Sequence, residues 1–307
     1  MNSRKLAQQS LVAFLLAAAC SSPTGNGSDP GLDPWIDERT FQVTYGSQDD
    51  GHAGVVSILA ETAEGGSWLL CTGVLVGPRA VLTAAHCLND DFATPLRVAF
   101  GASAQQPTMT RRVIARLVHP DYEVEPLSDH DLAVLAIERD VPTSIAPFTY
   151  GLPVADTLVR LVGFGANESS DSSIGRKRTG TARIDEVGTT RFRVAAAPSL
   201  TCFHDSGAPA LSEQGEVETL VGITTSGRND CAGFSRFMRA DVYWDSFILP
   251  SISLANSLPV PPAEPIAPRP MGGCQMRRSG VGAPSRTSAA LLGVTLLQLR
   301  RIRRSRR

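Results

Sequence analysis

The sequence has little of what defines several other protein classes. Only 6% of its 307 residues are aromatic and 19% are charged, although it holds 27 Gly and 21 Pro. It has no CxxC pair, no glycine-rich phosphate loop, and no apolar run of the roughly 20 residues that a membrane-spanning helix needs. We therefore expect no structural metal, no cofactor and no helical anchor. With 42% hydrophobic residues, the chain is long enough for one large core or two smaller ones.

The charge is unevenly distributed along the chain. The formal net charge is −1, but the segment from Met271 onward carries nine Arg and no acidic residue. The rest of the chain keeps 20 basic and 30 acidic residues, a net charge of about −10. Because nucleic acid repels an acidic surface, we expect no nucleic-acid partner.

The N-terminus has the pattern of an export signal. Arg4 and Lys5 precede the apolar run Leu11–Ala19, so residues 1–19 are predicted to be a signal peptide. The letters LLAAAC resemble a bacterial lipobox, which implies that Cys20 is lipidated, while an ordinary cleaved signal is the alternative. Residues 20–42 are rich in Ser, Gly, Pro and Asp, which predicts a flexible tether or a short propeptide.

The C-terminus has a pattern of its own. Residues 251–270 are predicted to be a Pro-rich linker, followed by a sorting segment at 271–307. That segment holds a Gly-Cys, the short apolar run Ser288–Leu299 and an Arg cluster, an order that resembles the MYXO-CTERM class of bacterial sorting signals. A basic amphipathic surface helix is the alternative. Both ends predict an exported protein, either secreted or attached to the bacterial outer surface through the Cys20 lipid or the C-terminal segment.

The central region contains an even number of cysteines. An even number in an exported protein predicts two disulfides, and three pairings are formally open. Pairing Cys71 with Cys87 and Cys202 with Cys231 would close two short loops, and each disulfide would stabilise the fold by about 3 kcal/mol in the loop-entropy account. The four cysteines are Cys71, Cys87, Cys202 and Cys231.

Short apolar runs separated by turn residues fill residues 43–250. The runs are rich in β-branched residues and mostly four to eight residues long, which is typical of strands. Helical periodicity extends over more than two turns only near Tyr243–Leu254. The pattern therefore predicts an all-β barrel or sandwich of about 200 residues with a short C-terminal helix.

Three motifs in this region together carry reactive side chains. They are TAAHC with His86, DLAVL beginning at Asp131, and CFHDSGAP with Ser206. Each motif alone is weak evidence for a catalytic site, since Asp, Ser and Gly are ordinary turn formers. Together they place His, Asp and Ser in the chain order of one class of catalytic triad.

With these motifs, residues 43–250 resemble the trypsin/chymotrypsin family of serine peptidases. The VGFG segment beginning at Val162 and the GITTSG segment at 222–227 resemble further family segments. The resemblance implies two perpendicular six-stranded β-barrels, and the four central cysteines fall where two family disulfides fall. It also implies protein or peptide substrates, and we expect a monomer.

The resemblance also assigns roles at the site. His86 would be the general base for the Ser206 nucleophile, with Asp131 orienting the imidazole. The backbone N–H groups of His204 and Ser206 would form the oxyanion hole, although glycine is usual where His204 stands. Asp205 would pair with a new N-terminus at Val43, with Phe41 as the alternative start, which would make the protein a zymogen.

The expected specificity pocket departs from the trypsin pattern. Its base aligns with Leu200 instead of an aspartate, so a Lys or Arg side chain would be buried without a partner. We therefore predict that the enzyme prefers apolar or small residues before the scissile bond. The pocket would be formed by Leu200, Thr201, Thr225, Ser226 and Gly227.

Two other functions remain open for the same fold. One is a catalytically impaired binding module at the cell surface, with the oxyanion hole disrupted by His204. The other is an esterase-like hydrolase that uses the same triad. Activity on a peptide compared with a simple ester separates the esterase from the peptidase.

Overall fold

The computed structural model describes residues 43–262 except 45, 89–93, 125–127, 168–173 and 214–216. The predicted signal peptide, the tether, Cys20 and the sorting segment lie outside the described residues and stay predictions. None of the helices in the described part has the length and apolar character needed to cross a membrane.

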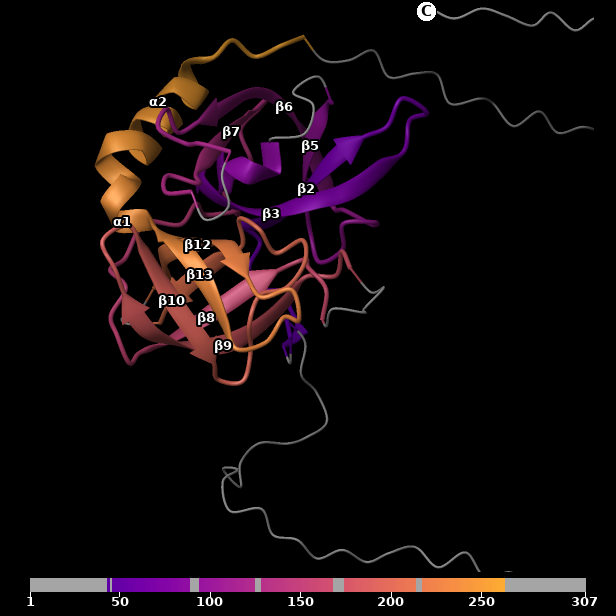
Figure 1. Ribbon diagram of the computed structural model, residues 1–307. Helices are drawn as coiled ribbons and strands as arrows, with labels where there is room; N and C mark the ends of the chain where they lie inside the picture. The colour runs from indigo at the N-terminus through magenta and orange to yellow at the C-terminus, as the bar shows by residue number, and fades with distance from the viewer. Residues whose placement is uncertain are drawn as a thin grey trace, which may run out of the picture. The chain divides into compact units, whose positions relative to one another are not determined.

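The first half of the described chain forms a closed antiparallel barrel (Figure 1). Its strands follow the order β2-β3-β4-β7-β6-β5 around the barrel. β4 and β7 are buried along their whole length, which explains their uninterrupted apolar sequences. The strands are β2 (Val55–Glu61), β3 (Ser67–Gly77), β4 (Ala80–Thr83), β5 (Leu96–Phe100), β6 (Met109–Val118) and β7 (Ala133–Ile137).

The second half closes another ring of six antiparallel strands. The order is β9-β10-β13-β12-β11-β8, and β8 pairs with β9 to close the ring. β1 (Ser47–Gln48) adds to the outside of β9. The strands are β8 (Leu158–Gly163), β9 (Arg178–Val187), β10 (Arg191–Ala196), β11 (Pro209–Ser212), β12 (Thr219–Gly227) and β13 (Phe234–Arg239). The prediction of two six-stranded barrels is confirmed.

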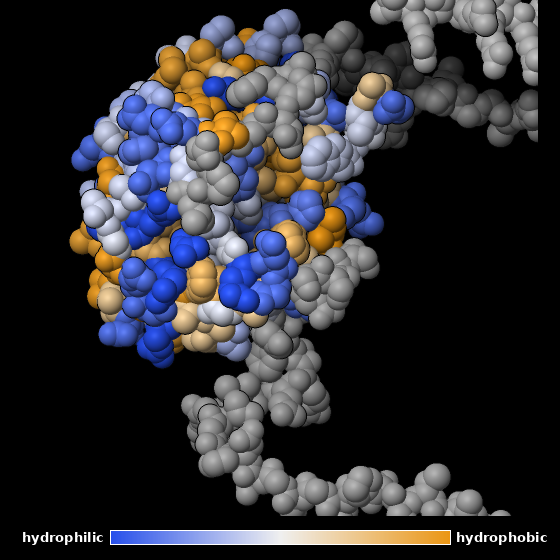
Figure 2. Space-filling view, in the orientation of Figure 1, coloured by the Kyte–Doolittle hydropathy of each residue, from blue (hydrophilic) through white to orange (hydrophobic). Residues whose placement is uncertain are grey.

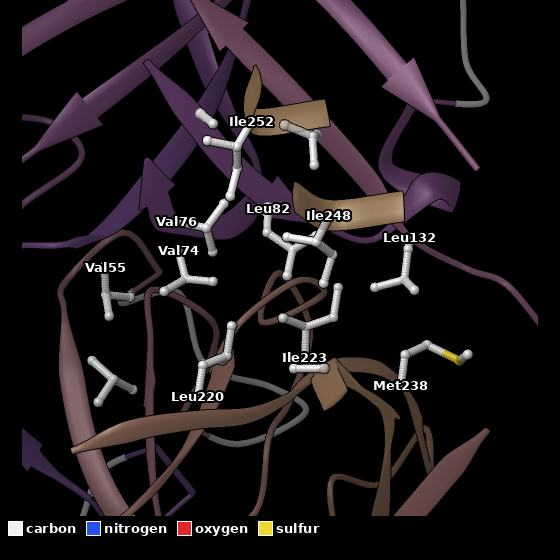
Figure 3. Close-up of a cluster of buried hydrophobic side chains, with 14 of the residues drawn as sticks. Val55, Val74, Val76, Leu82, Leu132, Leu220, Ile223, Met238, Ile248 and Ile252 are labelled. Atoms are coloured by element: carbon white, nitrogen blue, oxygen red, sulfur yellow. The ribbon is translucent and has the colours of Figure 1, made fainter. Parts of the chain in front are cut away.

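Each barrel has its own apolar interior, and a third cluster lies between the barrels. Figure 3 shows this cluster, in which side chains of both barrels meet those of the C-terminal helical segment. Removing this apolar surface from water holds the two barrels and the helical segment together. Members drawn there include Val55, Val74, Leu82, Leu220, Ile223, Met238, Ile248 and Ile252.

The helical segment runs from one barrel to the other (Figure 1). It comprises α1 (Ala240–Tyr243), the π-helical turn η2 (Trp244–Ile248) and α2 (Leu249–Ser257). α1 contacts β12, and α2 contacts β4 and β7. The short C-terminal helix is thus confirmed, and it includes residues 251–257, which the sequence analysis placed in the linker.

A partly buried ionic cluster attaches the start of the described chain to the second barrel. His52 bonds through Nδ1 to Asp49 at 2.8 Å and through Nε2 to Glu218 at 2.9 Å. The other oxygen of Glu218 accepts a bond from Arg160 on β8. Lys177, which is fully buried, donates to the His52 carbonyl at 2.7 Å. These bonds fix the entry of the chain into β2.

The surface of the folded region is largely polar. Figure 2 shows hydrophilic residues spread over much of the visible face of the second barrel, with hydrophobic residues interspersed among them. Single exposed apolar side chains such as Trp68 and Leu152 are ordinary on a folded protein.

Candidate active site

His86 and Asp131 are brought together by the pairing of two strands. β4 leads into the 3₁₀ turn η1 (Ala85–Leu88), which carries His86, and Asp131 lies two residues before the start of β7. Because Thr83 pairs with Ala133 across β4 and β7, the two residues emerge at the same edge of the first barrel.

Both carboxylate oxygens of Asp131 bind the histidine. Asp131 Oδ2 lies 2.8 Å from His86 Nδ1, and Oδ1 accepts the His86 backbone N–H at 2.9 Å. The Asp131 side chain is 9% exposed and the His86 side chain 34%. In the neutral imidazole this bond places the proton on Nδ1 and leaves a lone pair on Nε2.

The loop that carries Ser206 belongs to the second barrel but rests on strands of the first. The Ser206 carbonyl accepts the backbone N–H of Thr72 on β3 at 3.0 Å. The Thr72 carbonyl in turn accepts the Thr83 hydroxyl at 2.8 Å. Gly207 has φ +81°, and a Cβ there would collide with Thr72 and Thr83. The structure therefore places the Ser206 loop beside Thr83, the last residue of β4, and Thr83 lies three residues before His86 in the sequence.

His204 occupies the left-handed backbone region that glycine usually fills. Its φ is +71°, its carbonyl accepts the Thr72 hydroxyl at 3.1 Å, and its Nδ1 lies 3.3 Å from the Leu70 carbonyl. Within the described residues, neither the His204 nor the Ser206 backbone N–H donates a hydrogen bond. Two N–H donors are thus available to an anion, as an oxyanion hole requires.

Asp205 is a buried carboxylate held by backbone N–H groups. Its side chain accepts bonds from Gly165 at 2.8 Å and Cys202 at 3.0 Å, and the residue is 1% exposed. Burial raises the pKa of Asp205 to about 6, against the lowering effect of these two bonds and of the nearby Arg178 charge. A Cβ at Gly163 or Gly165 would overlap this carboxylate, which explains both glycines.

The predicted partner of Asp205, Val43, lies in the core of the second barrel. Val43 is 3% exposed and belongs to the same apolar cluster as Leu200. The next residue, Thr44, bonds to the backbone of Leu200 in both directions. In the continuous chain Val43 has no free amino group, so its pairing with Asp205 stays a prediction.

The residues predicted for the specificity pocket lie near one another. Leu200 and Thr201 are buried, while Thr225 and Ser226 are half-buried and Gly227 is exposed. The Thr201 hydroxyl donates to the Ser235 hydroxyl at 2.9 Å, and Ser235 pairs with Gly227 across β12 and β13.

The neighbouring Asp230 does not supply a buried charge. Its carboxylate is 53% exposed and pairs with Arg228 at 2.9 Å. A substrate Lys or Arg would need a buried carboxylate as its partner, and the exposed Arg228–Asp230 ion pair does not provide one. The preference for non-basic residues before the scissile bond therefore stays a prediction that this arrangement supports.

Sequence reasoning missed two residues that shape the site. Thr72 bonds to both His204 and Ser206, and Ser235 adds a hydroxyl beside Thr201. The signal available for Thr72 was a hydroxyl directly after Cys71 in a strand that is otherwise apolar. Ser235 had no local signal, because only the pairing of β12 with β13 brings it to Gly227.

The two disulfides brace the loops of the site. Cys71 bonds to Cys87, next to His86, and Cys202 bonds to Cys231. The two local pairings are confirmed. Cys71, His86 and Cys87 lie close enough to suggest a metal site, but both sulfurs are consumed by the disulfide.

Comparison with known proteins identifies similar chains. The trypsin family model matches residues 45–245. Granzyme M of Homo sapiens is 30% identical over 174 residues, covering 48% of this chain and 66% of its own. Trypsin 5G1 of Aedes aegypti is 28% identical over 257 residues, covering 71% and 87%. Venom serine protease Bi-VSP of Bombus ignitus is 26% identical over 227 residues, covering 59% of each chain. The chain thus spans about two thirds or less of the length of granzyme M and Bi-VSP.

The buried Asp205 should make stability depend on pH. A carboxyl whose pKa rises from 3.8 to about 6 on folding stabilises the fold below pH 4, and this contribution is lost as the pH rises through 6. A shift of about two units corresponds to ~3 kcal/mol. Urea unfolding between pH 4 and 8 should show this fall in the wild type and lack it in Asp205→Asn. Parallel pH profiles for the two proteins would contradict the assignment.

Proposed function

Because this chain belongs to the trypsin family, we propose that it is a serine endopeptidase with His86, Asp131 and Ser206 as its catalytic triad. The observation that carries the proposal is the pair of hydrogen bonds between His86 and Asp131, which holds the imidazole with its lone pair on Nε2. The second support is the pair of N–H groups at His204 and Ser206, which have no acceptor among the described residues and lie on a loop fixed to Thr72.

The proposed reaction proceeds through an acyl-enzyme. Ser206 Oγ attacks the peptide carbonyl while His86 Nε2 takes its proton, and the Asp131 carboxylate stabilises the imidazolium. The N–H groups of His204 and Ser206 bind the oxygen that becomes negative. His86 then protonates the leaving amine, and water deacylates Ser206 by the same route with His86 again as base.

The proposal includes activation by cleavage before Val43. Such a cut would create an α-ammonium group, which could provide the counter-charge that buried Asp205 lacks. The raised pKa of Asp205 supports this role, since its two N–H bonds and Arg178 do not compensate for burial. Arrival of a cation would favour the carboxylate and fix the adjoining His204 and Ser206 backbone.

Export to the cell surface or medium is part of the same proposal. Two disulfides fit an oxidising compartment. Protein or peptide substrates would be met there, with Cys20 or the segment at 271–307 supplying attachment.

A fluorophosphonate probe tests the proposed function directly. Protein cut before Val43 should be labelled stoichiometrically, the uncut full-length chain should take little label, and Ser206→Ala in the cut form should lose the label, since the probe needs both an activated serine and an oxyanion hole. Cleavage of a casein-type protein as well as a simple ester separates a peptidase from an esterase. N-terminal sequencing of the labelled form should begin at Val43. If folded protein takes no label even after the cut, the proposed peptidase activity is overturned and a binding module is favoured.

Primary specificity should exclude basic residues. Peptide anilides with Ala, Leu or Phe before the scissile bond should be cleaved roughly 100-fold faster, in kcat/KM, than matched Lys or Arg substrates, because an unpaired buried cation costs several kcal/mol. Ser206→Ala provides the background rate. A preference for Lys or Arg would contradict the pocket assigned to Leu200 and Thr201.

Substitutions at His204 should separate backbone shape from side-chain chemistry. Glycine adopts φ +71° without strain, so His204→Gly should keep or raise kcat. Valine is strongly disfavoured there, so His204→Val should misplace one oxyanion donor and lower kcat roughly 100-fold with little change in KM. Thermal unfolding of both variants controls for misfolding. Equal kcat in the two variants would show that the His204 N–H is not used.

A further inference from the structure

Two histidines and an aspartate meet next to the catalytic aspartate but take no part in the proposed reaction. His119 follows the end of β6, Asp121 lies two residues later, and His130 directly precedes Asp131. One ligand atom from each of the three lies within 4.8 Å of the others. The two imidazoles stack with their centroids 4.7 Å apart.

The nitrogen atoms of this cluster are suited to bind a metal. His119 Nδ1 accepts the Asp121 backbone N–H at 3.2 Å, so it carries a lone pair next to the residue whose carboxylate completes the set. A metal would replace this long hydrogen bond, and the exposed Asp121 N–H could then bond to water.

The second imidazole has an oriented partner behind it. His130 Nδ1 lies 3.2 Å from the Tyr243 hydroxyl. When Nδ1 donates to this oxygen, Nε2 carries the lone pair, an arrangement common for metal-binding histidines. Tyr243 and Phe247 of the helical segment contact the His119 ring at centroid distances of 5.3 and 4.9 Å. These aromatic rings pack against one side of the cluster, while Asp121 on the other side is exposed to solvent.

We propose that His119, Asp121 and His130 bind one divalent transition-metal ion of the Zn²⁺ type. Two imidazoles and one carboxylate are borderline ligands that suit Zn²⁺, Ni²⁺ or Cu²⁺, with water filling the remaining position. Ca²⁺ and Mg²⁺ favour sites made only of oxygen atoms. The three donor atoms lie within 4.8 Å of one another, and small side-chain rotations would bring them to the closer spacing that a shared ion needs.

Occupancy of this site should slow catalysis, a consequence that rests on the proposed function. His130 is held at φ +64° and is covalently joined to Asp131, which binds His86 through both oxygens. Drawing the His130 ring toward a metal moves the backbone that positions Asp131. The expected effect is a lower kcat with little change in KM, since the substrate-binding strand β12 is not moved.

Calorimetric titration with ZnCl₂ tests the site without relying on activity. The protein is the full-length chain carrying His86→Ala and no histidine tag, which removes the competing imidazole of the active site. We expect one Zn²⁺ per chain. His119→Gln and His130→Asn should each weaken binding roughly 10- to 100-fold or more, since loss of outer-shell partners alone costs that much.

Matched variants identify the third ligand and control for charge. Asp121→Asn should weaken binding, whereas Glu123→Gln, an exposed acid two residues away, should not. Asn is chosen at position 130 because it tolerates positive φ, and circular dichroism confirms folding. No Zn²⁺ binding, or binding that is unchanged by both imidazole substitutions, would overturn the site.

Enzyme kinetics on chains that carry an intact His86 and have been cut before Val43 test the coupling. Zn²⁺ should lower the kcat of the wild type, and His119→Gln should relieve this inhibition while keeping basal activity. Equal inhibition of both proteins would place the ion at His86 and overturn the coupling. A wild type that lacks activity but binds Zn²⁺ as described would refute the proposed function and leave the metal site supported.

Discussion

The site depends on the docking of the 202–208 loop of the second barrel against β3 of the first. Thr72 makes this contact through two groups and bonds to the end of β4 through a third. Its backbone N–H binds the Ser206 carbonyl, its hydroxyl binds the His204 carbonyl, and its own carbonyl accepts the Thr83 hydroxyl. The hydroxyl also accepts the Phe164 N–H at 3.2 Å. One residue thus connects the loop of Ser206 with the strand that leads to His86, and the apolar cluster between the barrels keeps these bonds away from water.

The same loop contains an unfavourable element that the rest of the structure must accommodate. Asp205 is buried with two backbone donors and the field of Arg178, which do not offset its desolvation. Gly163 and Gly165 leave room for the carboxylate at the cost of chain entropy. Natural proteins carry such locally unfavourable groups mainly at functional positions, where the cost is covered by stability elsewhere. The buried charge therefore supports a functional role for the loop more strongly than a structural one.

Local patterns in the sequence predicted the parts of the structure that are themselves local. Short β-branched runs became the strands of the two barrels, and TAAHC and DLAVL became the ends of β4 and β7 that hold His86 and Asp131. The helix was less well bounded. Pro250 was predicted to end the folded region, but it lies in the first turn of α2, which continues directly from the π-helical turn η2.

What sequence reasoning could not supply depends on strand pairing over long distances. Ser235 reaches Thr201 only because β13 pairs with β12, and Thr72 reaches Ser206 across 134 positions of the chain. His119 follows the last residue of β6, and His130 lies shortly before the first residue of β7. The two rings stack because the end of β6 pairs with the start of β7, with Val118 opposite Ala133. No periodicity or motif encodes these registers, since each is settled by the closure of a barrel.

Backbone conformation links the two parts of the molecule that carry chemistry. His130, His204 and Gly207 have φ values of +64°, +71° and +81°, and they adjoin Asp131, Asp205 and Ser206. Non-glycine residues hold this conformation only where surrounding bonds enforce it, and here Thr72 fixes His204 while Tyr243 contacts His130. The position of Asp131 is therefore sensitive to small displacements of the His130 backbone, as that of Asp205 is to displacements of His204. For that reason a ligand that engages the His130 ring acts on Asp131 directly through the chain, without needing a change elsewhere in either barrel.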